Sequence, residues 1–354
     1  MDFYAELSGE QRVIADEIDD FLREPYPVRP WYHFQGLAGC GKSFVLSRIA
    51  RKYPQATMCA FTGKAASVLS RRTGMEAITV HAAIYQYCGD DEDREPIFKP
   101  KLESGEWEGN IVLLDECGTI GKYIAQDLLN TGCKIVTCGD PGQLRPVRDE
   151  RFFTTPDAEL YEVRRQALDS AIIRQAHAVK HYGVYESDGP DFQVKQFISR
   201  DEIMGAGIIL CYKNVTRAML NRLVRSHHGW DRMIPQKGEP VMCLKNNYKY
   251  ATLNGAVYTL LENHVPGQPM TLVNERGHEV SIPNAWVEDL EAPILQDNHV
   301  PFAMAYAATV HKAQGSEWDS LIMVDEYNKE EERREWLYTG FTRAAKSTII
   351  QRDW

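Results

Sequence analysis

The eight residues GLAGCGKS at positions 36–43 constrain this chain more than any other part of its sequence. They fit the pattern GxxxxGK[ST], in which a glycine-rich loop between a strand and a helix turns successive backbone N–H groups toward a phosphate. An aromatic-rich run at 31–34 precedes the loop, and residues 44–52 have the pattern of a helix whose N-terminus would face the same anion. The chain is therefore expected to be an α/β protein with a phosphate site.

Each residue type in this loop has a physical reason. Gly36, Gly39 and Gly41 allow the backbone to turn its N–H groups inward on the phosphates. Lys42 supplies a point charge to the β and γ phosphate oxygens, and Ser43 offers a hydroxyl to Mg²⁺. The loop therefore predicts a nucleoside triphosphate and Mg²⁺ as ligands. The alternative is a glycine-rich turn before a helix that binds no phosphate.

Two more buried strands are expected to end in polar residues. The run Ile111–Leu114 leads into Asp115 and Glu116. Asp115 is expected to hold the hydration shell of Mg²⁺, and Glu116 to orient or deprotonate the water that attacks the γ-phosphate. The run at 133–138 leads into GDPGQLRPV, which places Gln143 at the carboxyl end of the strand, within reach of a γ-phosphate. Together with the glycine-rich loop, these residues predict hydrolysis of the nucleotide.

Composition limits the class of protein further. Fifty acidic residues against forty basic ones give a formal charge of -10, so any site for a polyanion must be local. No apolar run approaches the roughly 18 residues of a membrane span, and the first residues lack the pattern of a secretory leader. The eight cysteines include no CxxC pair. These features predict a cytoplasmic protein with no membrane partner.

In this order, GLAGCGKS, LLDECGT and GDPGQLRPV resemble the motifs of superfamily 1 helicases, and within them the RecD-like and Dda-like branch, superfamily 1B. Further motifs of that family follow over nearly the whole chain. The resemblance implies ATP and Mg²⁺ as cofactors and two RecA-like P-loop domains with parallel sheets. It also implies a monomeric DNA helicase that moves 5′ to 3′ on single-stranded DNA and unwinds forked DNA during replication or repair, in a bacterial or phage-infected cytosol. Replication proteins are candidate partners.

Three more nucleotide contacts come from this resemblance alone. Gln11, in LSGEQ, matches the family's adenine-reading element, although Ser8 and Gln11 also have the pattern of an ordinary helix N-cap. Arg165 and Arg343 match the family's two arginine fingers. The neighbouring Arg164 does not match the finger position. Arginine suits both positions because its planar group contacts two γ-phosphate oxygens at once. With both fingers on the second half, ATP would be fully enclosed only when the two halves close.

The family's motifs Ia, Ib and V are matched by FTGKAAS at 61–67, TVH at 79–81 and AYAATVHKAQGSEWD at 305–319. A Thr-Gly-Lys turn that opens a helix can clamp a phosphate, because backbone N–H groups and the lysine converge there. The residues implied to contact DNA are Thr62, Lys64, His81, Thr309, His311 and Lys312, and Gly315 is implied to contact the nucleotide. Three departures from the family pattern are Phe61 and Arg145, where proline is usual, and Gly118, where serine is usual.

The expected strands form two sheets. The first contains runs at 31–34, 56–61, 111–114 and 133–138, and the second contains runs at 207–212, 302–309, 321–324 and 347–351. Helices at 215–226 and 331–341 would cover the second sheet. We expect a first RecA-like domain at 1–155 with a pin insertion at about 82–109, a second at 156–244 and 301–354, and a small β-barrel at 245–300, where the family has an SH3-like subdomain.

The insertion at 82–109 contains an acidic stretch followed by IFKPKLESGEW. Phe98 and Trp107 flank a Ser104-Gly105 turn signal, which predicts a hairpin where family members carry their strand-separating pin. An exposed ring there can exchange base–base stacking for base–ring stacking, so Phe98 is the first candidate for this contact and Trp107 the second. A disordered acidic loop is the alternative.

A basic segment at 213–232 is expected to line part of the DNA track. Its basic residues are Lys213, Arg217, Arg222, Arg225 and Arg232, with one acid, Asp231, and with His227, His228 and Trp230 beside them. A solvated helix face is the alternative. Two other functions stay open: an RNA translocase or nucleic-acid-stimulated ATPase without DNA unwinding, and a nucleic-acid-binding subunit that does not hydrolyse ATP. The last is disfavoured because Lys42 and Glu116 are both present.

Overall fold

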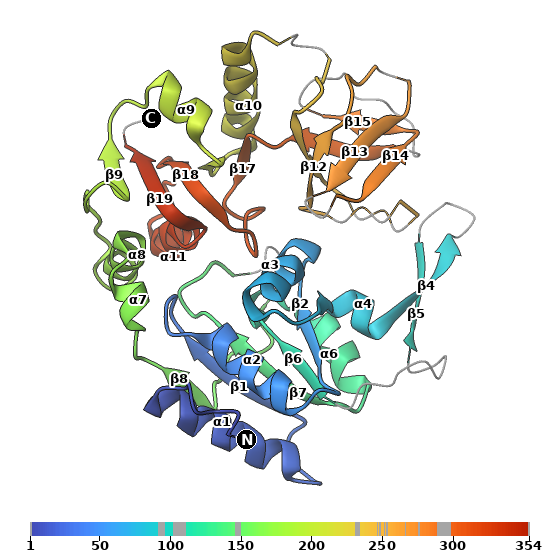
Figure 1. Ribbon diagram of the computed structural model, residues 1–354, viewed down its shortest axis with the longest axis vertical. Coiled ribbons are helices and arrows are strands. Elements are labelled where there is room, and N and C mark those ends of the chain that lie inside the picture. The colour runs from blue at the N-terminus through green and yellow to red at the C-terminus, as the bar shows by residue number, and fades with distance from the viewer. Residues whose placement is uncertain are drawn as a thin grey trace. The chain divides into compact units, whose positions relative to one another are not determined.

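The computed structural model describes residues 2–90, 96–101, 111–145, 150–230, 234–245, 247, 249–250, 252, 254–265, 267–274, 277–288 and 299–352, without the side chains of Asp90, Pro96, Arg165 and Gln166. The chain divides into two compact units, Met1–His177 and Ala178–Trp354. Each unit contains a parallel sheet accompanied by helices (Figure 1). None of the helices in the described ranges is long and apolar enough to cross a membrane.

The first unit is built on a six-stranded parallel sheet in the order β3-β2-β6-β7-β1-β8. Its strands are β1 (Trp31–Gly36), β2 (Thr57–Ala60), β3 (Ala77–Thr79), β6 (Ile111–Leu114), β7 (Lys134–Gly139) and β8 (Ala158–Leu160). Its helices are α1 (Gly9–Arg23), α2 (Lys42–Lys52), α3 (Gly63–Thr73), α4 (Val80–Ile84), the 3-10 helix η1 (Cys117–Thr119), α6 (Lys122–Asn130) and α7 (Arg165–Leu168). Helix α8 (Ala171–Tyr182) passes from the first unit into the second.

Both faces of this sheet are buried. Along β6, Ile111 and Leu113 join the core formed with α1, α2 and α3, whereas Val112 and Leu114 join the core formed with α4 and α6. The alternation follows from the two-residue period of a strand, and burial on both sides explains why β6 is a continuous apolar run. Because the strands are parallel, the loops that follow β1, β6 and β7 lie at one edge of the sheet.

A two-stranded antiparallel hairpin follows α4. Its strands are β4 (Tyr85–Asp90) and β5 (Pro96–Pro100), and Tyr87 lies opposite Phe98. The strand that contains Phe98 therefore pairs with the segment before it, where Tyr85 and Tyr87 are aromatic partners of Phe98. Ser104, Gly105 and Trp107 themselves lie outside the described residues.

The second unit combines a parallel sheet with a mostly antiparallel one. The parallel sheet has the order β17-β10-β18-β19-β9 and contains β9 (Phe192–Lys195), β10 (Ile208–Cys211), β17 (Ala307–Thr309), β18 (Trp318–Val324) and β19 (Ala344–Gln351). Helices α9 (Arg200–Gly205), α10 (Asn214–His228) and α11 (Glu330–Phe341) accompany it. The other sheet has the order β14-β13-β12-β11-β16-β15 and contains β11 (Pro240–Cys243), β12 (Val257–Leu260), β13 (Met270–Asn274), β14 (Glu279–Ile282), β15 (Ala285–Val287) and β16 (Val300–Met304).

Two expectations about the division of the chain are wrong. The apolar run at 302–309 is two strands, of which β16 belongs to the mostly antiparallel sheet and β17 to the parallel sheet, because a continuous apolar run does not mark where a chain changes sheets. The second half does not begin at 156, because β8 pairs with β1 and the first unit extends to His177. Strand β8 is three residues long, too short to give a periodic signal. The SH3-like character of the small sheet stays a prediction.

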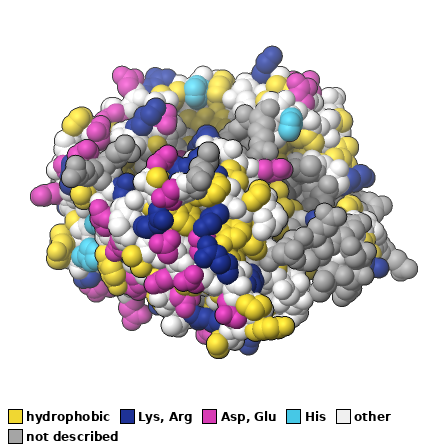
Figure 2. All heavy atoms as spheres, turned by 60° about the horizontal axis from the view of Figure 1, so that its bottom comes forward, with side chains coloured by type: hydrophobic (Ala, Val, Ile, Leu, Met, Phe, Trp, Pro, Cys, Tyr) yellow, Lys and Arg dark blue, Asp and Glu magenta, His cyan; other side chains and the backbone are white. Residues whose placement is uncertain are grey.

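The surface carries both signs of charge. On the face drawn in Figure 2, Lys and Arg side chains are interspersed with Asp and Glu side chains and with hydrophobic ones. This mixture agrees with the formal charge of -10 and with the expectation that a polyanion site occupies only part of the surface.

Candidate nucleotide and nucleic-acid sites

The phosphate loop runs from the end of β1 to the start of α2. Gly39 and Gly41 adopt φ angles of 89° and 81°, in the left-handed region that favours glycine. Gly36 is required for another reason, because a Cβ at this position would lie 2.8 Å from the carbonyl oxygen of Leu160 in β8. Gly39 is closely covered as well, since a Cβ there would lie 2.9 Å from the Cβ of Ala167 in α7. The loop conformation therefore depends both on glycine and on the elements packed against it.

Lys42 is the first residue of α2, and its ammonium group is bound within the loop. Its Nζ donates to the carbonyl oxygens of Gly36 at 2.7 Å and Leu37 at 3.1 Å, and it lies 3.6 Å from Asp140 Oδ2. Burial acts to lower the pKa of Lys42, but the neighbouring acidic groups, Asp140 above all, outweigh it, and the pKa is raised. The lysine therefore stays charged, as the neutralisation of phosphate oxygens requires.

The residues predicted to bind Mg²⁺ lie together. Ser43 Oγ donates to Asp115 Oδ2 at 2.6 Å, while Cys138 Sγ at 2.9 Å and the N–H of Glu116 at 2.8 Å donate to Asp115 Oδ1. A hydroxyl and a carboxylate from neighbouring loops fit Mg²⁺, which takes one or two protein oxygens and completes its shell with water and phosphate oxygens. Within the described ranges no group of three His, Cys, Asp or Glu residues could hold a metal ion by itself.

Glu116 follows Asp115 with φ 52° and ψ 43°. Among the residues that the structure describes, it is the only one other than glycine with a positive φ. Such conformations are energetically costly and collect at functional sites. The turn continues into η1, where Thr119 Oγ1 donates to the carbonyl oxygen of Glu116 at 3.1 Å. The chain thus turns sharply at the end of β6, which leaves the Glu116 side chain partly exposed beside buried Asp115.

Gln143 lies in the loop after β7, as the sequence predicts. Its N–H donates to the carbonyl oxygen of Asp140 at 3.3 Å, and Asp140 Oδ1 accepts from the N–H of Gly142 at 2.9 Å. Arg151 donates to the carbonyl oxygen of Gln143. Because Asp140 also lies 3.6 Å from the Lys42 ammonium group, the Gln143 loop adjoins the phosphate loop.

Gln11 contacts the phosphate loop directly. Ser8 is the N-cap of α1, and Ser8 and Gln11 form the capping box that their spacing allows. Gln11 Nε2 also donates to the carbonyl oxygen of Cys40 at 2.9 Å, and Gln11 is only 1% exposed. Its contact with adenine stays a prediction.

The two predicted arginine fingers lie in different units. Arg343 follows α11 in the second unit, where its Nε donates to the carbonyl oxygen of Thr339 at 3.1 Å and its Nη1 to that of Ser316 at 3.4 Å. Arg165 begins α7 in the first unit, so the expectation that both fingers lie on the second half is wrong. The reason is that β8 joins the first sheet and α7 packs on the phosphate loop. The finger roles themselves stay predictions.

A row of aromatic rings connects motif Ia to the hairpin. The ring centroids are 5.8 Å apart for Phe61 and His81, 6.0 Å for His81 and Tyr85, 6.3 Å for Tyr85 and Phe98, and 6.0 Å for Phe98 and Tyr87. These separations are typical of interacting aromatic side chains. The structure therefore places His81 and Phe98 in one row of rings. Phe61, which stands where the family usually has proline, lies at the end of this row.

The start of α3 holds the predicted phosphate clamp. Thr62 is the N-cap of α3 and accepts from the N–H of Ala65 at 3.1 Å, and Lys64 lies in the first turn. The first N–H groups of a helix lack partners within the helix, so they favour an anion. Burial lowers the pKa of nearby His81, which favours the neutral ring.

Motif V lies at the end of β17 in the second unit. Thr309 Oγ1 accepts from the N–H of Lys312 at 3.4 Å, and Lys312 Nζ donates to Asn254 Oδ1 at 3.0 Å. Lys312 lines a cavity of about 420 Å³ between α10 and the small sheet. Burial lowers the pKa of His311, and Gly315 adopts a φ angle of 73°. The motif V residues are thus neighbours, while their contacts with DNA and nucleotide stay predictions.

The basic segment at 213–232 is largely occupied by contacts within the chain. Its ion pairs are Lys213 with Glu326 at 3.6 Å, Arg217 with Glu288 at 2.5 Å and Arg225 with Glu239 at 2.7 Å. His228 and Trp230 stack on each other with their centroids 4.0 Å apart. Asp231 and Arg232 lie outside the described residues. The three acids lie outside the segment, so it is less of a basic track than its local composition predicted.

Two buried residues of the first sheet, Cys138 and His33, were not identified from the sequence. Cys138 donates to Asp115, and burial, followed by the Asp115 charge, raises the pKa of its thiol well above the usual value. His33 is buried with Nδ1 2.9 Å from Thr137 Oγ1, and burial lowers its pKa to about 4. Cys138 could have been found, because it is the residue before Gly-Asp at the carboxyl end of a strand. His33 has no sequence signal that separates it from an ordinary core residue.

Family models and known proteins match large parts of this chain. One family model, an AAA domain, matches residues 27–187, and another, a UvrD-like helicase C-terminal domain, matches residues 304–350. The ATP-dependent RecD2 DNA helicase of Deinococcus radiodurans is 26% identical over 347 residues, which cover 87% of this chain and 45% of that protein. Pif1 from Bacteroides bound to single-stranded DNA aligns with a TM-score of 0.63 and 17% identity, over 97% of this chain and 92% of that chain.

A second solved structure, of forked duplex DNA unwound by two coordinating Pif1 helicases, aligns with a TM-score of 0.65 and 17% identity, over 97% of this chain and 92% of that chain. The two family models and the RecD2 relative support the family inferred from the motif order, the RecD/Pif1-like helicases of superfamily 1B. The α/β class with parallel sheets is confirmed. The matched part of the chain spans 45% of the RecD2 relative and 56% of a related mimivirus protein, about half the length of each.

Proposed function

We propose that this chain is an ATP-dependent DNA helicase that hydrolyses ATP with Mg²⁺, moves 5′ to 3′ along single-stranded DNA and unwinds forked duplex DNA. One observation carries the proposal: Ser43 Oγ donates to Asp115 Oδ2 beside Glu116, at the same sheet edge as the charged ammonium group of Lys42. This is the set of groups that phosphoryl transfer to water needs.

The roles of these groups follow from their chemistry. Lys42 neutralises the terminal phosphates, and the loop N–H groups orient them. Ser43 and Asp115 would hold Mg²⁺, which would supply further neutralisation of charge on the transferred phosphoryl group. Glu116 positions or deprotonates the attacking water, and Gln143, on the adjoining loop, contacts the γ-phosphate. Arg343, and Arg165 beside the loop, stabilise the charge of the transition state.

The nucleic-acid side of the proposal rests on the first unit's aromatic row and on the start of α3. Thr62 and Lys64 are suited to hold phosphates of the single strand, and the rings from Phe61 to Phe98 are suited to stack on bases without sequence preference. DNA is supported as the nucleic acid because the RecD2 relative is a DNA helicase and the similar Pif1 structures concern single-stranded or forked DNA. Thr309, His311 and Lys312 supply contacts in the second unit, and Gly315 of the same motif contacts the nucleotide.

The deciding experiment measures ATP hydrolysis with and without single-stranded DNA, and then strand separation on forks with a 5′ tail, a 3′ tail or matched RNA strands. We expect DNA to stimulate hydrolysis and the fork with a 5′ tail to be unwound. Unwinding that requires a 3′ tail would reverse the polarity, and stimulation by RNA without DNA unwinding would favour a translocase. A chain that binds DNA but hydrolyses no nucleotide would contradict the proposal.

The setting of the activity is proposed with it. We infer a cytoplasmic enzyme, of a bacterium or a phage-infected cell, that acts as a monomer in replication or repair alongside replication proteins. Sedimentation of the protein on a short single strand tests the stoichiometry, and one copy per strand is expected. Two copies bound together on a strand too short for two separate binding sites would contradict the monomer.

A further inference from the structure

Helix α8 contacts the phosphate loop with two side chains that lie one turn apart. His177 Nε2 is 2.8 Å from the carbonyl oxygen of Ala38 in the loop. Ile173 lies four residues earlier on the same face of the helix and covers the next loop residue, because a Cβ on Gly39 would lie 3.3 Å from Ile173 Cγ2. No motif singled out in the sequence contains His177, so its place at the loop is a finding of the structure.

The chemistry of the two groups fixes the direction of this hydrogen bond. A carbonyl oxygen can only accept, so Nε2 of His177 carries the proton and donates it to Ala38. The neutral ring with its proton on Nε2 and the fully protonated ring both present this N–H. The contact therefore does not depend on the charge of the histidine.

The contact sets the orientation of the peptide between Ala38 and Gly39. In a trans peptide the carbonyl of one residue and the N–H of the next point in opposite directions. Because the carbonyl of Ala38 is directed at α8, the N–H of Gly39 is turned to the other side, where the loop pattern places the phosphates. Gly39 then continues the turn with a φ angle of 89°, which favours glycine.

The next peptide of the loop is held by the same part of the chain. The N–H of Arg164, shortly before the helices α7 and α8, donates to the carbonyl oxygen of Gly39 at 3.0 Å. Two consecutive carbonyls of the loop thus accept from the segment 164–177, one from a backbone N–H and one from a side chain. A substitution can remove only the contact made by a side chain, so His177 is the residue that can be tested.

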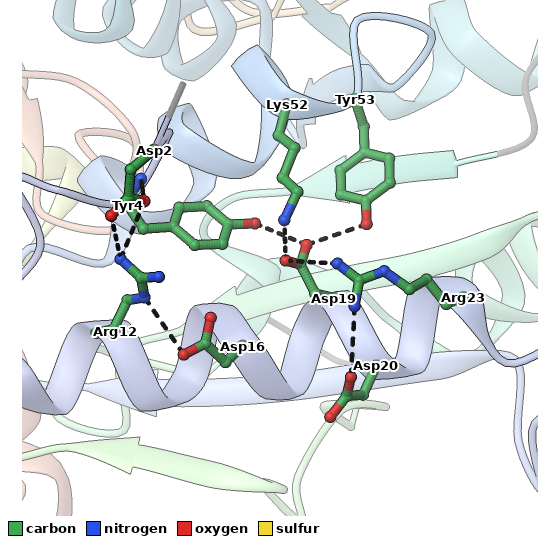
Figure 3. A network of polar contacts seen from close by, with 9 residues as sticks. All are labelled: Asp2, Tyr4, Arg12, Asp16, Asp19, Asp20, Arg23, Lys52 and Tyr53. Carbon is green, nitrogen blue, oxygen red and sulfur yellow. Dashed lines mark hydrogen bonds and ion pairs between the residues drawn. The ribbon is translucent and has the colours of Figure 1, made fainter.

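The helix that follows the loop is fixed separately, at its far end, as Figure 3 shows. Lys52, the last residue of α2, forms an ion pair with Asp19 of α1. Asp19 is 3% exposed and also accepts from the hydroxyls of Tyr4 at 2.7 Å and Tyr53 at 3.0 Å. This network holds α2 in place, whereas the part of the loop before α2 is held by the contacts from the segment 164–177.

We propose that His177 is a positioning residue for phosphate binding, which turns the N–H of Gly39 toward the phosphates by holding the carbonyl of Ala38. The inference rests on the proposed function in that it assumes a nucleoside triphosphate as the ligand of the loop. Its consequence is that a triphosphate without any base depends on His177 as strongly as ATP does. A second consequence is that any side chain with a donor at the place of Nε2 can replace the histidine.

The test compares wild type with His177→Phe, which keeps a ring but has no donor, and with His177→Gln, whose side-chain nitrogen can take the place of Nε2. Binding of Mg²⁺-ATP and Mg²⁺-tripolyphosphate is measured by calorimetry, and KM and kcat are measured for ATP. We expect His177→Phe to weaken both ligands by the same factor, about 3- to 10-fold for the loss of one hydrogen bond. His177→Gln should bind both ligands within about twofold of wild type.

The kinetic constants separate this role from a role in the chemical step. KM for ATP should rise in His177→Phe by the same factor as the dissociation constant, while kcat stays within about twofold, because the loop N–H serves the ground state and the transition state alike. The matched control is His181→Phe, which makes the same change at an exposed histidine of the same helix and should alter none of these values. Thermal unfolding of each variant shows whether the fold is kept, and His177→Leu replaces the phenylalanine variant if that one does not fold.

Three results would overturn the inference. A loss of affinity for ATP with unchanged tripolyphosphate would mean that the contact does not act on the phosphates. Equal losses in His177→Phe and His177→Gln would mean that packing, and not the hydrogen bond, is responsible. Unchanged binding in His177→Phe would mean that the contact with Ala38 has no role in binding. If wild type hydrolyses no ATP, the proposed function fails, while the binding of tripolyphosphate still decides the role of His177.

Discussion

Ser43 and Asp115 stand 72 positions apart in the sequence and are joined by a hydrogen bond of 2.6 Å from Oγ to Oδ2. The bond links the loop after β1 to the loop after β6, which the order of the parallel sheet brings to one edge. The same two oxygens are expected to bind Mg²⁺. This hydrogen bond therefore holds the two predicted metal-binding residues together.

Glu116→Gln should keep ATP binding and lose turnover by several orders of magnitude, because an amide cannot accept the proton of the attacking water. Lys42→Ala should abolish hydrolysis for a different reason, because it removes the positive charge that neutralises the phosphates. Single-turnover hydrolysis measured beside nucleotide binding separates the two effects. Normal turnover in Glu116→Gln would remove this residue from the chemistry.

Cys138→Ala should raise the Mg²⁺ concentration needed for half-maximal binding of nucleotide by about 10-fold, because residues that orient a metal ligand typically contribute at least that much. The thiol donates to Asp115 Oδ1 at 2.9 Å. Cys138→Ser keeps a donor at this place and should stay close to wild type. Equal losses in the alanine and serine variants would mean that the site responds to packing and not to the hydrogen bond.

Arg343→Ala and Arg165→Ala should each lower kcat by about 10³-fold with little effect on nucleotide affinity, as expected for charges that act on the transition state. Arg164→Ala is the control for Arg165, because it keeps the backbone N–H of Arg164 that donates to the carbonyl oxygen of Gly39 in the phosphate loop. Rates are compared at saturating ATP and DNA. A loss of affinity with unchanged kcat would assign these arginines to ground-state binding.

Phe98→Ala should strongly reduce duplex unwinding while ATPase stimulated by single-stranded DNA stays near normal. The ring lies in β5, opposite Tyr87, and base–ring stacking of about 1–3 kcal/mol is comparable to one base-pair step. Tyr87→Ala is the matched variant on the paired strand, and Phe98→Ala with Trp107→Ala removes the second candidate too. Unwinding and ATPase that fall in equal proportion would exclude the hairpin as the separating element.

The sequence predicted the nucleotide site far better than the division of the chain, for physical reasons. Lys42, Asp115 and Gln143 each follow a buried strand within a few residues, so local patterns locate them and the parallel sheet brings them together. The partners of α10 could not be predicted in this way, because Glu239 and Glu288 flank strands of the small sheet and no local pattern relates them to the helix. Arg165 was assigned to the wrong half because the three residues of β8 carry no periodic signal.

The ion pair of Arg225 and Glu239 tests whether this arginine of α10 stabilises the fold or contacts DNA. Both side chains are buried, 2% and 0% exposed, with Nε 2.7 Å from Oε1. Arg225→Met leaves an uncompensated buried carboxylate and should destabilise the protein by about 3–5 kcal/mol.

Denaturant unfolding measures this loss, and Arg225→Met combined with Glu239→Gln should recover part of it because no charge is then left alone. Arg222→Met, at an exposed arginine of the same helix, is the control and should change stability by less than about 0.5 kcal/mol. Affinity for single-stranded DNA should stay within about twofold in Arg225→Met and in the double variant, since Arg225 is engaged inside the protein. A fall of DNA affinity of about 10-fold without a change in stability would instead return Arg225 to the DNA track, because a phosphate contact contributes to binding and not to folding.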